Sequence, residues 1–172
     1  MPLTGKLLAT AMVTVLIVSP WWWSGSDGGI LRELALLGAW GSVAVGAAFF
    51  ALVACYCRLL QRTLERIAPA HRTASPRSVW WMFAIPYNFV EDFVIVGNVA
   101  SSLRAAAAAR PGALRRWLLL GWAWCALQIL SLLPGELGMT TGALALLAWL
   151  AHWVFTARLH ARLPAVSPSP VE

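Results

Sequence analysis

The feature that most constrains this chain is an uncharged apolar run of about two dozen residues, from Leu34 to Cys57. Roughly 20 consecutive apolar residues are enough to cross a bilayer as an α-helix. The whole chain of 172 residues is 60% hydrophobic and 12% charged, with a mean hydropathy of +0.71, whereas a soluble domain carries about 25% charged residues. These values predict an all-α integral membrane protein and exclude a disordered, fibrous or disulfide-stapled chain.

Three further stretches are apolar enough to be membrane helices. We expect transmembrane helices over residues 7–23, 34–57, 117–133 and 142–157, with a turn at Pro134 and Gly135 between the last two. The first stretch ends in tryptophans, which favour the headgroup region. We interpret it as a retained helix, because the small residues of a signal-peptide cleavage site are missing. The tail at residues 164–172 is expected to be flexible.

The apolar segment 79–103 is flanked by arginines on both sides. Positive residues gather on the cytoplasmic side of membrane proteins, and a segment with both ends on one side cannot cross once. We therefore expect a re-entrant or interfacial helical hairpin at 79–103. The predicted topology is a multi-pass protein of the cell inner membrane with four transmembrane helices and both termini cytoplasmic. The flanking arginines are Arg58, Arg62, Arg66, Arg72 and Arg77 before the segment and Arg104, Arg110, Arg115 and Arg116 after it.

The net charge of +6 comes from these arginines and from other basic residues, including Lys6, that we assign to the same side. In a soluble protein such a charge would indicate nucleic acid binding. Here the basic residues adjoin apolar segments, so no nucleic acid partner is expected. The arginines are predicted to form a cytoplasmic basic surface for anionic membrane lipid or a protein partner.

Segment 79–103 also carries polar residues that are costly in a bilayer. Pro86 breaks a helix and frees backbone carbonyls, which the side-chain amide of Asn88 can satisfy. Glu91 and Asp92 are functional candidates if they lie within the membrane. The interpretation we favour places both acids at the cytoplasmic interface, paired with nearby arginines. Those arginines are Arg77, Arg104 and Arg115, and the candidate functional segment comprises Pro86, Asn88, Glu91, Asp92 and Asn98.

Two features concern the contacts between helices. Gly38, Ser42 and Gly46 recur every four residues in the second predicted helix, and such a ridge of small residues lets another helix approach closely. Packing within the chain is favoured over a contact with another chain. His152 lies inside the last predicted helix, where a hydrogen bond to Gln128 or to a neighbouring helix is favoured over a role as a haem ligand.

Signatures of catalysis are missing from the sequence. It contains no glycine-rich phosphate loop, no HExxH motif and no nucleophile elbow. The three cysteines, Cys55, Cys57 and Cys125, do not have the spacing of metal ligands. We therefore expect no enzyme activity, no metal and no cofactor.

The middle of the chain resembles a known family. The residues that carry the resemblance are Ser75-Pro76, Trp80, Trp81, Phe83, Pro86, Asn88 and Ser101-Ser102. Their order is similar to the Ser-Pro…Trp-Phe-x-Pro-x-x-Asn signature of an uncharacterised family of four-helix bacterial membrane proteins, a domain of unknown function. The proline-to-asparagine spacing is one residue shorter here, and Val90-Glu91 stand where the family has Arg-Pro. The resemblance implies four helices and supplies no activity.

Three functions follow as hypotheses. The favoured one is a non-enzymatic interaction or accessory subunit of a larger membrane complex, which binds a membrane-protein partner, a second copy of itself or anionic lipid. The alternative is a small transporter or channel component whose polar path lies at segment 79–103. The third is a binder of haem or a lipophilic ligand that uses His152.

Overall fold

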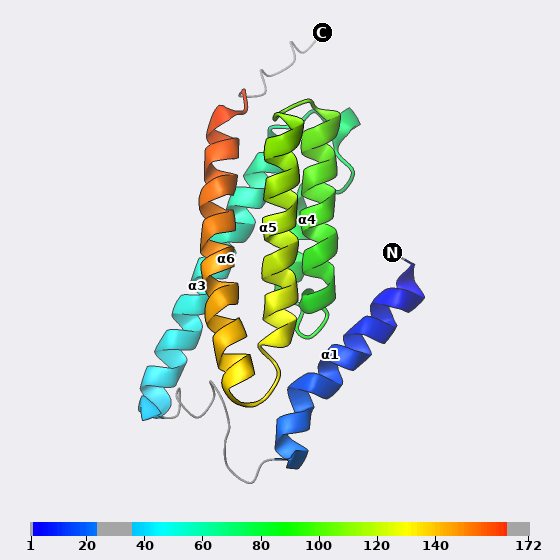
Figure 1. Ribbon diagram of the computed structural model, residues 1–172. Coiled ribbons are helices and arrows are strands. Elements are labelled where there is room, and N and C mark those ends of the chain that lie inside the picture. The colour runs from blue at the N-terminus through cyan, green and yellow to red at the C-terminus, as the bar shows by residue number, and fades with distance from the viewer. Residues whose placement is uncertain (1, 24–35, 165–172) are drawn as a thin grey trace.

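The computed structural model describes residues 2–23 and 36–164 (Figure 1). The described residues form helices and no strand, which confirms the expected all-α class. The long helices are α1 (Leu3–Trp23), α3 (Gly38–Glu65), α4 (Asn88–Ala105), α5 (Pro111–Leu130) and α6 (Gly135–Arg162). Two short 3-10 helices, η1 (Pro69–His71) and η2 (Pro76–Phe83), lie between α3 and α4. The predicted flexible tail lies outside the described residues, apart from Pro164.

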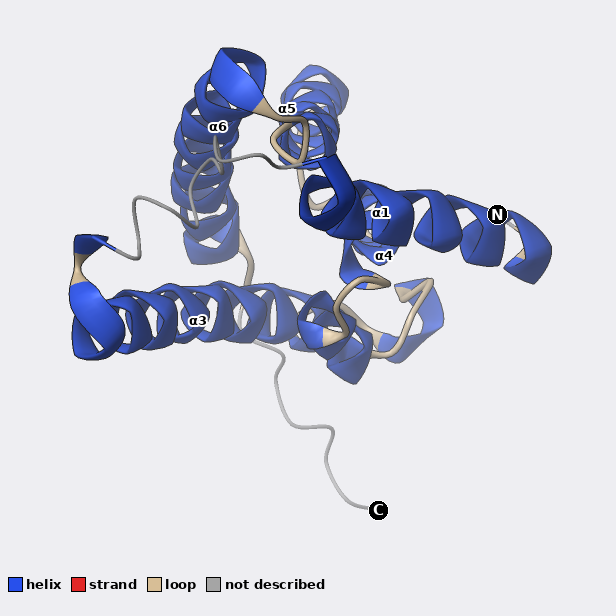
Figure 2. Cartoon of the chain, turned by 90° about the horizontal axis from the view of Figure 1, so that it is seen from below, coloured by secondary structure: helices blue, strands red, loops and turns tan. Residues whose placement is uncertain are grey.

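Four of the long helices form a bundle. α3, α4, α5 and α6 run along a common direction in Figure 1, and α5 and α6 are antiparallel neighbours. α1 packs mainly against α4 and projects sideways from the bundle, as Figure 2 shows. α3, α4 and α6 end, and α5 begins, at the same end of the bundle. We call it the arginine end, because the arginines of the predicted basic surface lie toward it.

Two helices have the length and apolarity that a membrane span requires. α3 and α6 are each 28 residues long and apolar enough to cross a bilayer. α6 contains the predicted span at 142–157, and α3 contains residues 38–57 of the predicted span at 34–57, of which residues 34 and 35 are not described. The predicted span at 7–23 falls on α1, whose apolar part is shorter, and the one at 117–133 falls on α5, which ends at Leu130. Four transmembrane helices therefore stay a prediction.

The chain that follows α3 folds back along that helix. The Trp80 indole Nε1 donates a hydrogen bond to Gln61 Oε1 (2.7 Å), and the ring of Phe83 stacks on that of Phe50 with centroids 6.1 Å apart. The chain therefore runs antiparallel to α3 from the level of Gln61 to that of Phe50. It then reverses at Pro86, and α4 leads back to the arginine end.

Segment 79–103 thus has the path of a hairpin. Near the arginine end the chain that precedes the first limb is bonded to the second limb, because the Thr73 amide donates to Ser102 Oγ (3.0 Å) and the Thr73 hydroxyl donates to the Asn98 carbonyl (2.8 Å). The first limb is mainly a 3-10 helix, and only the second is an α-helix. Because an α-helix rises about 1.5 Å per residue, Phe83 beside Phe50 lies roughly 22 Å along α3 from Glu65, and the tip at Pro86 lies beyond Phe83. The tip is therefore far from the arginine end.

Candidate functional site

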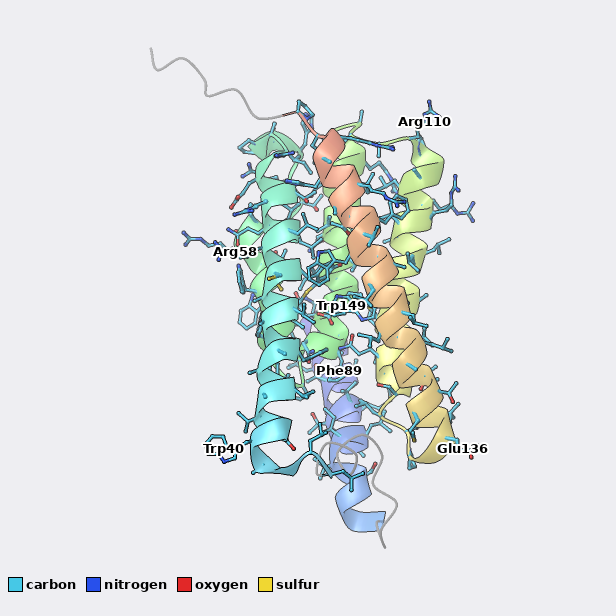
Figure 3. All side chains as sticks on the ribbon, turned by 90° about the vertical axis from the view of Figure 1, so that its left-hand side faces the viewer. Trp40, Arg58, Phe89, Arg110, Glu136 and Trp149 are labelled. Atoms are coloured by element: carbon cyan, nitrogen blue, oxygen red, sulfur yellow. The ribbon has the colours of Figure 1, made fainter. Side chains whose placement is uncertain are left out.

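Three polar side chains lie together at the hairpin tip. Asn88, Glu91 and Asp92 share one face of the first turns of α4, because residues three and four apart are neighbours on a helix. Their exposed fractions are 7%, 9% and 2%. Figure 3 places Phe89, which follows Asn88 in the chain, between Arg110 at one end of the bundle and Glu136 at the other, nearer to Glu136. The three polar residues are therefore buried and far from the arginine end.

Glu91 forms an ion pair with the first helix. Lys6 Nζ lies 2.7 Å from Glu91 Oε2, and both side chains are largely covered. The same ammonium lies 5.9 Å from the ring centroid of Tyr87, within the range of a cation–π contact. Lys6 therefore lies at the hairpin tip and not among the arginines, so its assignment to the arginine end is wrong. We call Lys6, Asn88, Glu91 and Asp92 the tip cluster.

The expected pairing of the two acids with Arg77, Arg104 or Arg115 is also wrong. Those arginines lie toward the arginine end, whereas α4 begins far from it, and the counter-charge of Glu91 is Lys6. Among the described residues, no ion pair or hydrogen bond reaches the side chain of Asp92. The side-chain oxygen of Asn88 is likewise buried without a partner there.

An unpaired buried carboxylate is strongly disfavoured in its charged form. The Asp92 side chain is 2% exposed, and the neighbouring carboxylate of Glu91 adds a like charge beside it. Asp92 is therefore a carboxyl group that holds a proton where an exposed aspartate would release it. Together with Lys6 and Glu91, whose charges cancel, a protonated Asp92 leaves the tip cluster without net charge.

His152 lies in a separate aromatic cluster between α3, α5 and α6. Its Nδ1 shares a hydrogen bond with the Tyr56 hydroxyl (2.7 Å), and the Trp117 ring lies 4.4 Å from it between centroids. The Trp117 indole donates to Thr156 Oγ1 (2.9 Å), which itself donates to the His152 carbonyl (2.7 Å). The favoured interpretation, a hydrogen bond to a neighbouring helix, is confirmed for α3. The Gln128 alternative is not seen.

The other nitrogen of His152 is closed off by α5. A Cβ atom placed on Gly121 would lie 2.7 Å from His152 Nε2 and 2.7 Å from Val96 Cγ1. The side chain of His152 is fully buried. Neither ring nitrogen is therefore presented to a ligand, and this arrangement gives the haem hypothesis no support.

No other described part of the chain packs against the small-residue ridge at its two glycines. No described residue comes within 4 Å of the Cβ positions of Gly38 and Gly46. Side chains around them, such as those of Trp40 and Val43, are 87% and 63% exposed. The expected packing within the chain is therefore not found there.

The basic surface divides into engaged and free arginines. Arg66 donates to the carbonyls of His160 and Leu163, and Arg72 donates to those of Ile67 and Glu65, so these two hold the ends of α3 and α6 in place. Arg116 donates weakly to a carbonyl in its own helix. The remaining predicted arginines bind no described residue through their side chains, and Figure 3 shows Arg58 and Arg110 pointing outward. These free arginines are Arg58, Arg62, Arg77, Arg104, Arg110 and Arg115.

Comparison with known proteins identifies no relative. No protein-family model, no curated protein and no solved structure matches the chain. The resemblance to the four-helix bacterial family stays a prediction. In the described part of the chain, no three histidine, cysteine or acidic side chains are grouped so as to hold a metal ion.

Exchange of the two charges tests the Lys6–Glu91 pair. Lys6→Glu and Glu91→Lys each bring like charges together, and we expect each to lower the unfolding temperature in detergent. Breaking a buried pair costs about 3 kcal/mol or more. The double exchange restores opposite charges and is expected to recover most of the loss, as measured by circular dichroism. Glu136→Lys, at an exposed site on α6, is the matched control. A double variant as unstable as the two losses combined would refute the pair.

Proposed function

We propose that the chain is a multi-pass membrane protein in which the tip cluster is the proton-binding site of a small transporter or channel component. The observation that carries this proposal is the buried Asp92, which has no partner among the described residues and lies beside the Lys6–Glu91 pair. Ionisable groups within a membrane are expensive, and they mark proton or ion pathways. The two long apolar helices, α3 and α6, support the membrane location.

A proton suits this cluster better than a permanently bound metal ion. Lys6 already supplies the positive charge that balances Glu91, so one proton on Asp92 completes neutrality. Loss of that proton leaves a single negative charge in a buried site. This charge favours either the return of the proton or the entry of another cation. The free oxygen of Asn88 lies on the same helix face and offers a second acceptor. A one-charge change at this buried site is what a proton-coupled step requires.

Asp92→Asn tests the proposed proton site. The substitution keeps the size of the side chain and removes its titration. We expect purified protein in liposomes to pass protons under a pH gradient, measured with an internal pH-sensitive dye, and the variant to fall to the rate of protein-free liposomes. Glu136→Gln removes an acid at an exposed position and is expected to keep the wild-type rate. Wild-type protein that passes no more protons than empty liposomes would reject the proposal.

The topology that we propose is based on which loops lie at the arginine end of the bundle. The loops after α3 and after α4 lie there, and the turn between α5 and α6 lies at the other end. We propose that the arginine end, with the C-terminal end of α6, is cytoplasmic, and that α3, α5 and α6 cross while segment 79–103 enters and returns. A cytoplasmic N-terminus stays a prediction, since Lys6 lies at the hairpin tip and not among these arginines.

Reporter fusions test this topology. Fusions after residues 70 and 110 are both expected to report the cytoplasm, because both points lie at the arginine end. A fusion after Pro134 is expected to report the opposite side. Opposite signals from the fusions after residues 70 and 110 would contradict the hairpin and would require a single crossing between them.

A second candidate function is supported by the uncovered half of α3. The ridge of Gly38, Ser42 and Gly46 is not covered by the described chain at its two glycines, and close approach at such a ridge favours helix association in lipid. We therefore keep an accessory subunit, bound to a membrane-protein partner or to a second copy, as the alternative.

Native mass spectrometry in mild detergent tests this alternative. The expected result is a complex with defined stoichiometry, in which Gly46→Leu weakens the association because the added side chain separates the helices. Ala44→Leu places the same side chain at an exposed position on another side of α3 and is expected to leave the complex intact. A monomer in the wild type, or equal losses in both variants, would exclude the ridge as an interface.

A further inference from the structure

A shallow hollow on α6 is apolar at one end and positively charged at the other. It has a volume of about 300 Å³ and is lined by Ala151, Val154, Phe155, Arg158, Leu159 and Arg162. Ala151, Val154 and Phe155 lie toward the middle of the helix, whereas the two arginines lie one turn apart toward its end, with Leu159 between them. The hollow is therefore apolar at the level of the bundle interior and cationic at the arginine end.

The two arginines of this hollow have no partner within the described chain. No ion pair or hydrogen bond reaches the guanidinium of Arg158 or of Arg162 among residues 2–23 and 36–164, in contrast with Arg66, which binds two carbonyls. Both side chains are exposed, and no acidic residue lines the hollow. The negative end of the α6 dipole is equivalent to roughly half a charge, so two full positive charges dominate the potential there.

We propose that this hollow binds an anionic phospholipid, with the phosphate between Arg158 and Arg162 and an acyl chain along Ala151, Val154 and Phe155. Guanidinium groups recognise phosphate through paired charge-assisted hydrogen bonds. An apolar floor that continues from the cationic end gives room for a lipid tail, which a free phosphate ion would not use. The inference rests on the membrane placement proposed above and is independent of the proton site.

A second hollow at the arginine end fits a lipid less well. It has a volume of about 390 Å³ and is lined by Arg58, Gln61, Arg62, Glu65 and Trp80. Its carboxylate opposes an anion, and its lining is polar except for the indole ring. The indole N–H and the amide of Gln61 are already bonded to neighbours. The α6 hollow is therefore the better lipid site of the two.

The test is native mass spectrometry of the full-length protein in a nonionic detergent, titrated with dioleoylphosphatidylglycerol or dioleoylphosphatidylcholine. Wild-type protein is expected to retain the anionic lipid more tightly than the zwitterionic one. The double variant Arg158→Gln/Arg162→Gln is expected to weaken binding of phosphatidylglycerol roughly 30-fold, since each basic residue near an anionic headgroup contributes about 1 kcal/mol. Binding of phosphatidylcholine should change little.

The matched control is Arg104→Gln/Arg110→Gln, which removes the same charge from the same end of the bundle outside the hollow. It is expected to keep the wild-type affinity, and an equal loss would show that only the overall charge matters. Ala151→Trp fills the exposed apolar floor and is expected to weaken both lipids. Unchanged binding in the Arg158/Arg162 variant would overturn the site, and displacement of the lipid by an equal concentration of inorganic phosphate would overturn the lipid assignment.

The same preparation separates the two proposals. Protein that stays soluble after removal of detergent would overturn the membrane placement itself. Protein that fractionates with membranes but binds phosphatidylglycerol equally well with and without Arg158 and Arg162 would overturn the lipid site alone.

Discussion

Non-helical backbone needs hydrogen-bond partners wherever water is absent, and the stretch between α3 and α4 obtains them from the helices beside it. Arg72 donates to the last carbonyls of α3 and its neighbour Ile67, and Thr73 bonds to α4 at two points. The Cys57 thiol donates to the carbonyl of Val79. These contacts hold the descending limb against α3, and its length determines where α4 begins. The depth of the tip cluster thus follows from how the chain after α3 is bonded.

The tip cluster and the aromatic cluster have different physical roles. Tyr56 and His152 share a hydrogen bond, and the Trp117 indole donates to Thr156, so these contacts connect three helices. The bare backbone of Gly121 allows α5 to close on the imidazole, whose Nε2 has no hydrogen-bond partner in the described chain. The tip cluster differs because its unpartnered atoms include a carboxyl oxygen, that of Asp92, beside the side-chain oxygen of Asn88. Unsatisfied groups cost stability, so they are more readily explained by a proton or ligand than by folding.

The sequence predicted those features that depend on composition along a single helix or on its flanks. The long uncharged run predicted α3, and arginines on both sides of segment 79–103 predicted that its ends lie together. It did not predict the Lys6–Glu91 pair, because counting charges assigns Lys6 to the same side as the arginines. The sequence predicted a hydrogen bond of His152 to a neighbouring helix but not its partner Tyr56, because the two residues are 96 positions apart. The spacing of Gly38 and Gly46 indicates that a helix can approach, and it contains no information about which helix does so.

The separation of the two paired charges also matters for how the protein is made. Lys6 and Glu91 are 85 residues apart, and a ribosome adds roughly 5–20 residues per second. The first helix therefore leaves the ribosome several seconds before its counter-charge exists. During that interval the ammonium of Lys6 has to remain hydrated or at the headgroups, because hydrocarbon offers it no partner. The position of α1 in the bundle is thus a late event of assembly, completed only after the hairpin has formed.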